Sequence, residues 1–281
     1  MTNNNFNTPA QVLKANINTQ SSKTSVPMPK IILSGILAGM YIGFGAAASN
    51  VVMHNISNVG IARLLGGCVF PVGLIMIVLL GGELFTGDCL IVMAAADKKC
   101  TVGFACKLLV TVWFANLAGG LIVSGLVMLS GQTGYSAGLL GAYTIKVAYS
   151  KAAAAPAAAV SSGIMCNIFV CAAVLMAAAS KDIAGKIFAV FFPIMAFVLC
   201  GFEHCVANMY YIPAGIMAKS KYAELFSEIY EISREELDSV LNLKNFFINS
   251  FFVTLGNILG GMIFIGAALY YINKKNIDAA D

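Results

Sequence analysis

The chain has 281 residues, of which 59% are hydrophobic and 11% are charged, and its formal net charge is +4. Soluble domains carry about 25% charged residues, so this chain has too few polar groups to cover a globular surface. Composition therefore excludes an ordinary soluble protein and predicts one that is embedded in a lipid bilayer.

The N-terminal segment, residues 1–29, is polar and rich in asparagine. It lacks the basic stretch, apolar stretch and small-residue cleavage site that together mark a signal peptide. We interpret residues 1–29 as a cytoplasmic tail, with a short helix around Gln11–Ile17.

Six apolar stretches are long enough to cross the hydrocarbon core, which takes about 20 residues. They are residues 31–54, 59–96, 104–129, 157–180, 184–218 and 246–272. The second and fifth are too long for a simple span, and GGELFTGD (81–88) and GFEH (201–204) interrupt them. The sequence thus predicts an all-α integral membrane protein with six transmembrane helices, of which helices 2 and 5 are broken.

Lysine and arginine in the flanks set the expected orientation. The side that carries both termini holds ten of these residues and the opposite side holds seven. Because cytoplasmic loops are enriched in positive charge, both termini are expected in the cytoplasm. We expect a transmembrane channel domain at residues 30–273, between cytoplasmic tails at 1–29 and 274–281.

The longest polar loop is residues 219–244, and it is amphipathic. Its apolar residues Tyr222, Leu225, Phe226 and Ile229 recur at helical spacing. Ser233 and Glu236 have the spacing of a capping box, which predicts a second short helix. We expect this segment to lie on the outer surface or to contact a neighbouring subunit.

Three features recur in the same order in the two halves of the channel domain, about 30–130 and 157–272. Asn50 matches Asn167, Gly81-Gly82-Glu83 matches Gly201-Phe202-Glu203, and Asn116-Leu117-Ala118-Gly119-Gly120 matches Asn257-Ile258-Leu259-Gly260-Gly261. Each half has three spans, an odd number, so the two repeats must be inverted in the membrane. Inverted repeats with paired broken helices place a solute pathway at the midplane.

Glycines explain how the two spans can be interrupted. Gly81, Gly82 and Gly87 permit the first break, and Gly201 permits the second. Each break exposes the N–H groups of a half-helix, an electropositive end that suits an anion.

Glutamates follow the glycines at matching positions, Glu83 and Glu203. A carboxylate at membrane depth is costly and is usually paired or functional. We consider two roles: accepting hydrogen bonds from loop N–H groups, which the matched positions favour, or forming a cation site.

His204 has no counterpart in the first repeat, where Leu84 stands. Scaffold symmetry therefore does not account for it, although a neutral histidine bonding across the break is the structural alternative. Because histidine changes charge near neutral pH, we expect His204 to offer a positive charge or a proton to a passing anion.

Two lysines, Lys146 and Lys151, precede the fourth span. They either extend to the membrane interface or attract anions at the mouth of a vestibule, and the sequence leaves both possibilities open.

Motifs for catalysis are missing from the sequence. The eight cysteines form no C-x-x-C pair, and H-E-x-x-H, G-x-S-x-G and the P-loop pattern are absent. We expect no enzyme activity, cofactor, metal or nucleic-acid partner. Two alternatives are less well supported. An aquaporin-like channel for neutral solutes would need paired N-P-A motifs, which the sequence lacks. A membrane enzyme would need a Cys/His pair, and the nearest candidates, His204 and Cys205, are adjacent in sequence and poorly placed to face each other on a helix.

The motifs GGELFTGD (81–88) and GFEHCVANMYYIPAG (201–215), with six spans in this order, resemble the formate/nitrite transporter family from about residue 25 to 272. The resemblance implies homopentamers of aquaporin-like protomers in the cell (inner or plasma) membrane, each with its own pore. It implies transport of small monovalent anions: formate, nitrite, hydrosulfide and, in some members, acetate or lactate.

The resemblance also implies roles for particular residues. By position, Leu84 and Thr86 lie on a movable loop at the pore, Phe197 faces the constriction with Phe70 and Leu74 nearby, His204 is the central protonatable residue, Lys151 is a vestibule lysine, and Asn167 is a polar group near the histidine. The chain departs from many relatives at Asp88 and Cys89.

These expectations combine into a mechanism. Removing a charge from water costs several kcal/mol, so an anion does not easily pass apolar rings. A weak acid that takes up a proton crosses as a neutral molecule. We therefore expect pH-dependent, proton-assisted transport of small inorganic or carboxylate anions, with His204 helping to supply the proton, directly or through water.

Overall fold

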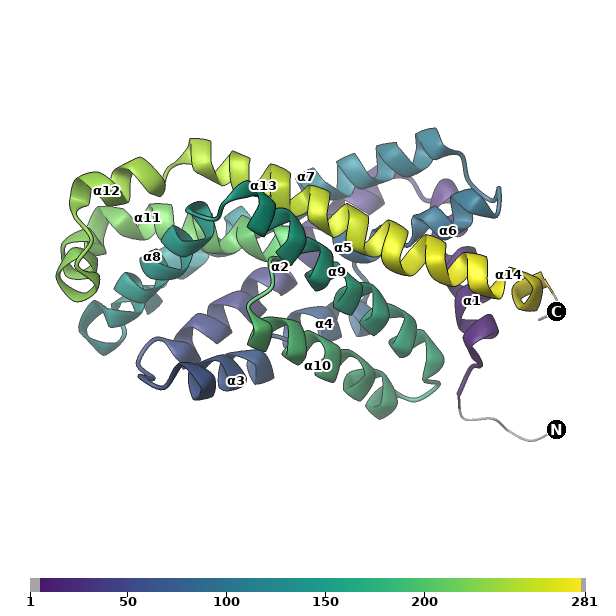
Figure 1. The fold of residues 1–281 in the computed structure, drawn as a ribbon, viewed down its shortest axis with the longest axis horizontal. Helices are drawn as coiled ribbons and strands as arrows, with labels where there is room; N and C mark the ends of the chain where they lie inside the picture. The colour runs from purple at the N-terminus through teal and green to yellow at the C-terminus, as the bar shows by residue number, and fades with distance from the viewer. Residues whose placement is uncertain (1–5, 279–281) are drawn as a thin grey trace.

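The computed structural model describes residues 6–278, so residues 1–5 and 279–281 of the two predicted tails lie outside it. Over the described range the chain is helical, apart from turns and an isolated bridge between Phe6 and Ser180. The helices form an elongated bundle, and the first and last of them lie at the same end (Figure 1). This common location agrees with termini on one side of the membrane.

The helices fall into two halves joined by a short helical segment. The first half contains α1 (Pro9–Ser22), η1 (Lys23–Ser25), α2 (Met28–Met53), α3 (Val59–Val69), α4 (Val72–Leu80), α5 (Phe85–Asp88), α6 (Ile91–Ala96) and α7 (Val102–Leu129). The connection contains η2 (Gln132–Gly134), η3 (Ser136–Gly138) and α8 (Leu139–Ala152). The second half contains α9 (Pro156–Ala179), α10 (Ile183–Cys200), α11 (Cys205–Tyr230), α12 (Arg234–Val240), α13 (Leu243–Ile258), the π-helix η4 (Leu259–Ala267) and α14 (Ala268–Asp278).

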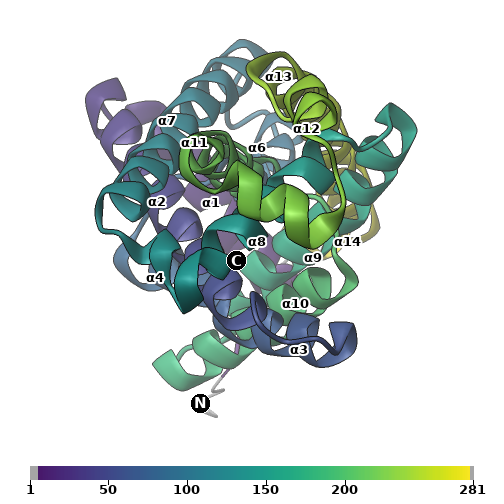
Figure 2. The ribbon, with the colours of Figure 1, turned by 90° about the vertical axis from the view of Figure 1, so that its left-hand side faces the viewer.

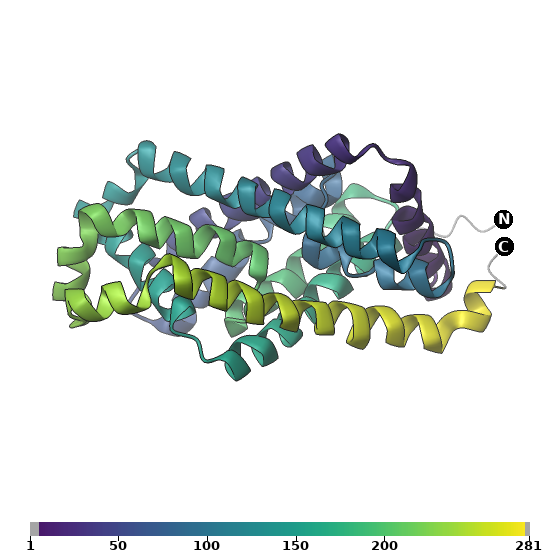
Figure 3. The ribbon, with the colours of Figure 1, turned by 90° about the horizontal axis from the view of Figure 1, so that it is seen from above.

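Six helical stretches of the described chain are long and apolar enough to cross a membrane, which confirms the predicted number of spans. They are Met28–Met53, Val59–Leu80, Val102–Leu129, Pro156–Ala179, Ile183–Cys200 and Leu243–Ile277. The last of them is one continuous rod of α13, η4 and α14 (Figure 3). Both predicted interruptions are present: the helix stops after Leu80 and after Cys200 and resumes at Phe85 and Cys205.

Two glycines end the half-helices before the breaks. Gly81 has φ +89° and Gly201 has φ +73°, a left-handed conformation that other residues adopt only under strain. Gly82 lies within the first break without a positive φ, and Gly87 lies inside α5. The backbone geometry therefore requires glycine at one position in each break.

In each half the first and third spans pack against each other, α2 against α7 and α9 against α13. Small residues allow this approach: a Cβ on Gly39 would collide with the Asn116 carbonyl, and one on Gly256 with the Val160 carbonyl. The two halves thus repeat one three-helix packing, as the recurring motifs predict.

The amphipathic helix predicted within residues 219–244 is confirmed, but it is not separate from the fifth span, because α11 continues as one helix to Tyr230. Tyr222, Ala223 and Phe226 are buried in a second apolar cluster that α8 and α11 share. This packing extends the helix. It is hard to foresee from the sequence, because the segment also carries many charged side chains. Figure 2 views the molecule from this end, where α8, α11 and α12 lie together.

Three short helices complete the comparison with the sequence. Ser233 caps α12 as predicted, accepting a 3.1 Å hydrogen bond from the Glu236 N–H. The predicted helix near Gln11–Ile17 is present but longer, as α1, and it begins with a capping box of Thr8 and Gln11. The sequence analysis did not predict α8.

Candidate functional site

The first break is closed by an asparagine from the third span. Asn116 Oδ1 accepts a 2.9 Å hydrogen bond from the Phe85 N–H. Its Nδ2 donates to the carbonyls of Glu83, at 2.9 Å, and Gly35, at 2.8 Å. One side chain therefore pairs backbone groups of the break that would otherwise be unpaired at membrane depth.

The second break is closed in the same way. Asn257 Oδ1 accepts from the Cys205 N–H at 2.9 Å, and its Nδ2 donates to the carbonyls of Glu203, at 3.0 Å, and Gly163, at 2.8 Å. The recurring N-x-x-G-G motif thus has a function in each repeat. Sequence reasoning found the motif but did not assign this role to it.

The two glutamates are paired with lysines. Lys23 Nζ lies 2.5 Å from Glu83 Oε2, and Lys151 Nζ lies 2.8 Å from Glu203 Oε1. The favoured prediction, that the glutamates accept from the loop N–H groups, is wrong, because asparagines fill that role. The alternative of a cation site is also weakened, since each carboxylate already has an ammonium partner.

The repeats differ five residues after each glutamate. Asn208 Nδ2 donates to Glu203 Oε2 at 2.6 Å. Asp88, the matching residue, is 4% exposed, and its Oδ1 lies 2.5 Å from Lys23 Nζ. Lys23 therefore forms ion pairs with two carboxylates. Lys151 pairs with one carboxylate, which also accepts a hydrogen bond from the neutral amide of Asn208.

The two breaks meet at His204, which is 2% exposed. Its Nδ1 caps α11 by accepting a 3.0 Å hydrogen bond from the Ala207 N–H. Its Nε2 lies 3.0 Å from Thr86 Oγ1 on the first break. Because Nδ1 acts as an acceptor, the neutral ring carries its proton on Nε2 and donates to the Thr86 hydroxyl.

Asn167 joins the first break to the last span. Its Nδ2 donates to the carbonyls of Thr86, at 3.2 Å, and Asn257, at 2.7 Å. Asn50, its counterpart in the sequence repeat, makes no such connection: its Nδ2 is buried and has no hydrogen-bond partner among the described residues. The asparagine match therefore reflects position and not a shared contact.

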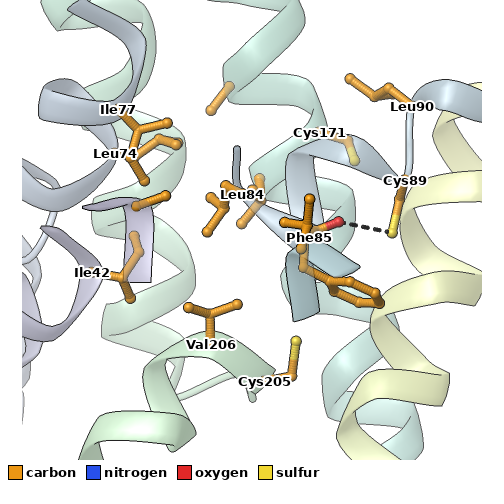
Figure 4. Packing of buried hydrophobic residues seen from close by; sticks show 14 of the residues in the cluster. Ile42, Leu74, Ile77, Leu84, Phe85, Cys89, Leu90, Cys171, Cys205 and Val206 are labelled. Atoms are coloured by element: carbon orange, nitrogen blue, oxygen red, sulfur yellow. Dashed lines mark hydrogen bonds between the residues drawn. The ribbon is translucent and has the colours of Figure 1, made fainter. Parts of the chain in front are cut away.

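Apolar side chains surround the Thr86–His204 contact. The Phe197 ring stacks on His204, with centroids 5.9 Å apart, and meets Phe70 edge-on at 5.6 Å. Leu84 and Leu74 are both buried in the main apolar cluster. In Figure 4, Leu84 points from the first break toward the side chains of Leu74 and Val206. A hydrated ion would have to lose water to pass between these groups.

A cavity of about 550 Å³ opens at the end of the bundle that carries α8. Its wall includes the cationic residues Arg63, Lys146 and Lys151, three tyrosines (Tyr143, Tyr211 and Tyr230), and Phe70, Phe197 and His204. We call this cavity the vestibule. The structure thus places most of the predicted site residues together, and it adds Arg63, to which the sequence analysis gave no role beyond orientation.

Six membrane-crossing helices in two repeats, with facing half-helices and a vestibule that reaches a buried histidine, define a multi-pass membrane transport protein. The family model described as "Formate/nitrite transporter" matches residues 10–271. The chain belongs to the formate/nitrite transporter family, and it is a transporter of small anions, not an enzyme.

Named relatives and solved structures agree with this assignment. The chain is 35% identical to a probable formate transporter of Methanothermobacter thermautotrophicus, covering 96% of this chain and 98% of the relative. It is 35% identical to the formate channel FocA of Haemophilus influenzae, covering 96% and 95%. A structure described as a pentameric formate channel with formate bound is 34% identical, with a TM-score of 0.80, over 90% of this chain and 99% of that one. An FNT family ion channel, 24% identical, has the same fold, with a TM-score of 0.78.

Proposed function

We propose that the protein transports formate, with other small monovalent anions such as nitrite and hydrosulfide as further candidates, and that a proton crosses with the anion. The observation that carries this proposal is the contact between Thr86 and His204, where the two breaks meet beside the vestibule. The names of the relatives, which include formate transporters and channels, supply the choice of formate.

The mechanism begins with the hydrogen bonds of His204. A protonated ring would lose the bond that Nδ1 accepts from Ala207, so the capped ring is held neutral. The neutral ring donates to Thr86, whose hydroxyl is then free to donate to the anion. This orientation favours an anion at the contact. There the anion takes its proton from a hydronium ion of the vestibule, which is left as water, and it passes Leu84 as a neutral molecule.

His204→Asn tests this proposal. Asparagine is a good N-cap and preserves the start of α11, but it lacks the Nε2 donor. A hydrogen bond to a charged group contributes about 1.5–3 kcal/mol, so formate flux is expected to fall by roughly 10- to 100-fold. Stopped-flow flux into proteoliposomes at two pH values measures it.

Two variants of the partner residue sharpen the test. Thr86→Ser keeps the hydroxyl and is expected to keep most of the flux, whereas Thr86→Val removes it and should resemble His204→Asn. Wild-type flux and pH dependence in a folded His204→Asn protein would refute the role of the histidine.

We also propose a homopentamer with both termini in the cytoplasm. The pentamer is suggested by the description of the related solved structure. Both breaks, Thr86 and His204 come from one chain, which fits one pore per protomer. Native mass spectrometry of the detergent-solubilised protein should give five chains, and protease protection in sealed vesicles should report the side of the termini.

A further inference from the structure

Three cationic side chains line the vestibule, but they differ in how far their charge is balanced. Lys151 is paired with Glu203, and its ammonium also lies 5.3 Å from the centre of the Tyr211 ring. The two paired side chains are 16% and 13% exposed. Because Glu203 is the one carboxylate among the residues that line the vestibule, it balances Lys151 and leaves the other two cations uncompensated.

Lys146 is held by aromatic rings. Its Nζ lies 4.8 Å from the centre of the Tyr230 ring and 5.9 Å from that of Tyr143. Aromatic faces attract a cation without cancelling its charge. Burial raises the pKa of Tyr143 to about 12, against the opposing effect of the Arg63 charge, so this phenol stays neutral and supplies no counter-charge.

Arg63 lies on α3 against the second break. A Cβ on Gly201 would lie 2.7 Å from Arg63 Nη1, so the guanidinium sits beside the C-terminal end of α10. That end carries partial negative charge, which favours a cation there. Within residues 6–278, neither Arg63 nor Lys146 forms an ion pair. Arg63 is exposed and faces the same cavity as His204.

We propose that Arg63 and Lys146 form a loading site for a planar anion with two oxygens, the class to which formate and nitrite belong. The guanidinium offers paired N–H donors to the two oxygens, and Lys146 supplies a second positive charge across Tyr143. Lys151, whose charge Glu203 balances, is not part of this loading site. This inference rests on the proposed anion transport and names the residues that concentrate the substrate.

The test separates anion capture from passage. Arg63→Gln, Lys146→Gln and the double variant are compared for formate uptake by cells that lack formate transport of their own. We expect each single change to raise KM at least threefold and the double change at least tenfold, with maximal uptake within twofold of the wild type. Arg63→Lys keeps the positive charge but loses the paired N–H donors of the guanidinium, so its KM should lie between those of the wild type and Arg63→Gln.

Lys244→Gln is the matched control, because it removes one exposed positive charge that does not line the vestibule. Its KM should equal that of the wild type. Raising the salt concentration should increase the wild-type KM and change that of the double variant much less. A double variant with wild-type KM and wild-type salt dependence would overturn the proposal.

Direct binding gives a second readout that does not depend on flux. The proton resonance of formate should broaden when wild-type protein in detergent is added, and the double variant should broaden it much less. Broadening without uptake in the wild type would refute formate transport and leave the loading site standing. Equal broadening by the wild type and the double variant, or none by either, would refute the loading site.

Discussion

The two breaks differ in charge because the residue five positions after the glutamate is Asp88 in the first repeat and Asn208 in the second. In the second repeat, Asn208 donates a hydrogen bond to Glu203, and Lys151 balances that carboxylate. In the first, the buried carboxylate of Asp88 lies beside the partly buried one of Glu83, which Lys23 already balances, and Asp88 Oδ2 has no hydrogen-bond partner among the described residues. A buried carboxylate without its own counter-charge is destabilising, so Asp88 carries a cost that Asn208 does not.

Asp88→Asn is therefore expected to keep or increase stability, because the new amide can bond to Glu83 as Asn208 bonds to Glu203. Lys23→Met should do the opposite: it leaves one buried and one partly buried carboxylate without their ammonium partner and is expected to cost about 3–5 kcal/mol. Thermal unfolding of the detergent-solubilised protein measures both. A marked loss of stability in Asp88→Asn would show that the aspartate has a partner of its own.

Single residues differ in how far the sequence reveals them. His204 stands out because the repeat offers no counterpart, and this asymmetry is visible without coordinates. Arg63 is not visible in that way, since its role depends on α3 lying against Gly201, a contact between distant parts of the chain. The pairing of Lys151 with Glu203 is hidden for the same reason.

At the scale of elements, each broken helix is completed by a different helix. The break in one span takes its polar partners from the third span of the same repeat, through Asn116 or Asn257. A glycine alone can end a helix, but it provides no partner for the backbone N–H and C=O groups that are left unpaired at the helix ends. The repeat therefore joins a glycine, a glutamate and an asparagine into one unit, although they are far apart in sequence.

Asn116→Ala and Asn257→Ala test this unit. Each leaves a buried N–H and two buried carbonyls without the side chain that pairs them, at about 1–3 kcal/mol for each group that finds no other partner. Both variants should lose thermal stability to a similar extent, because their contacts match. Asn273→Ala is the control, since that side chain bonds within its own helix, to the Leu269 carbonyl, and little change is expected. Unequal losses would mean that the two breaks differ in structure more than their hydrogen bonds indicate.

At the scale of the whole molecule, hydropathy and the internal repeat predict most of the fold. The six spans and both interruptions follow from apolar length and from the two glycine motifs. The connecting helix α8 and the continuation of α11 to Tyr230 do not follow from hydropathy, because each is buried through its contact with the other. An amphipathic pattern shows that a face will be covered but does not identify the covering element.

The asparagine that closes each break also constrains how the protein is made. When the ribosome has delivered α4 to α6, the carbonyl of Glu83 and the N–H of Phe85 have no partner until Asn116 on α7 follows. Unpaired backbone groups are not stable in lipid, so the insertion machinery is expected to retain the broken span until the third helix emerges. The second broken span, α10 with α11, depends on α13 in the same way. Release into the bilayer is thus expected to occur in groups of three helices and not one helix at a time.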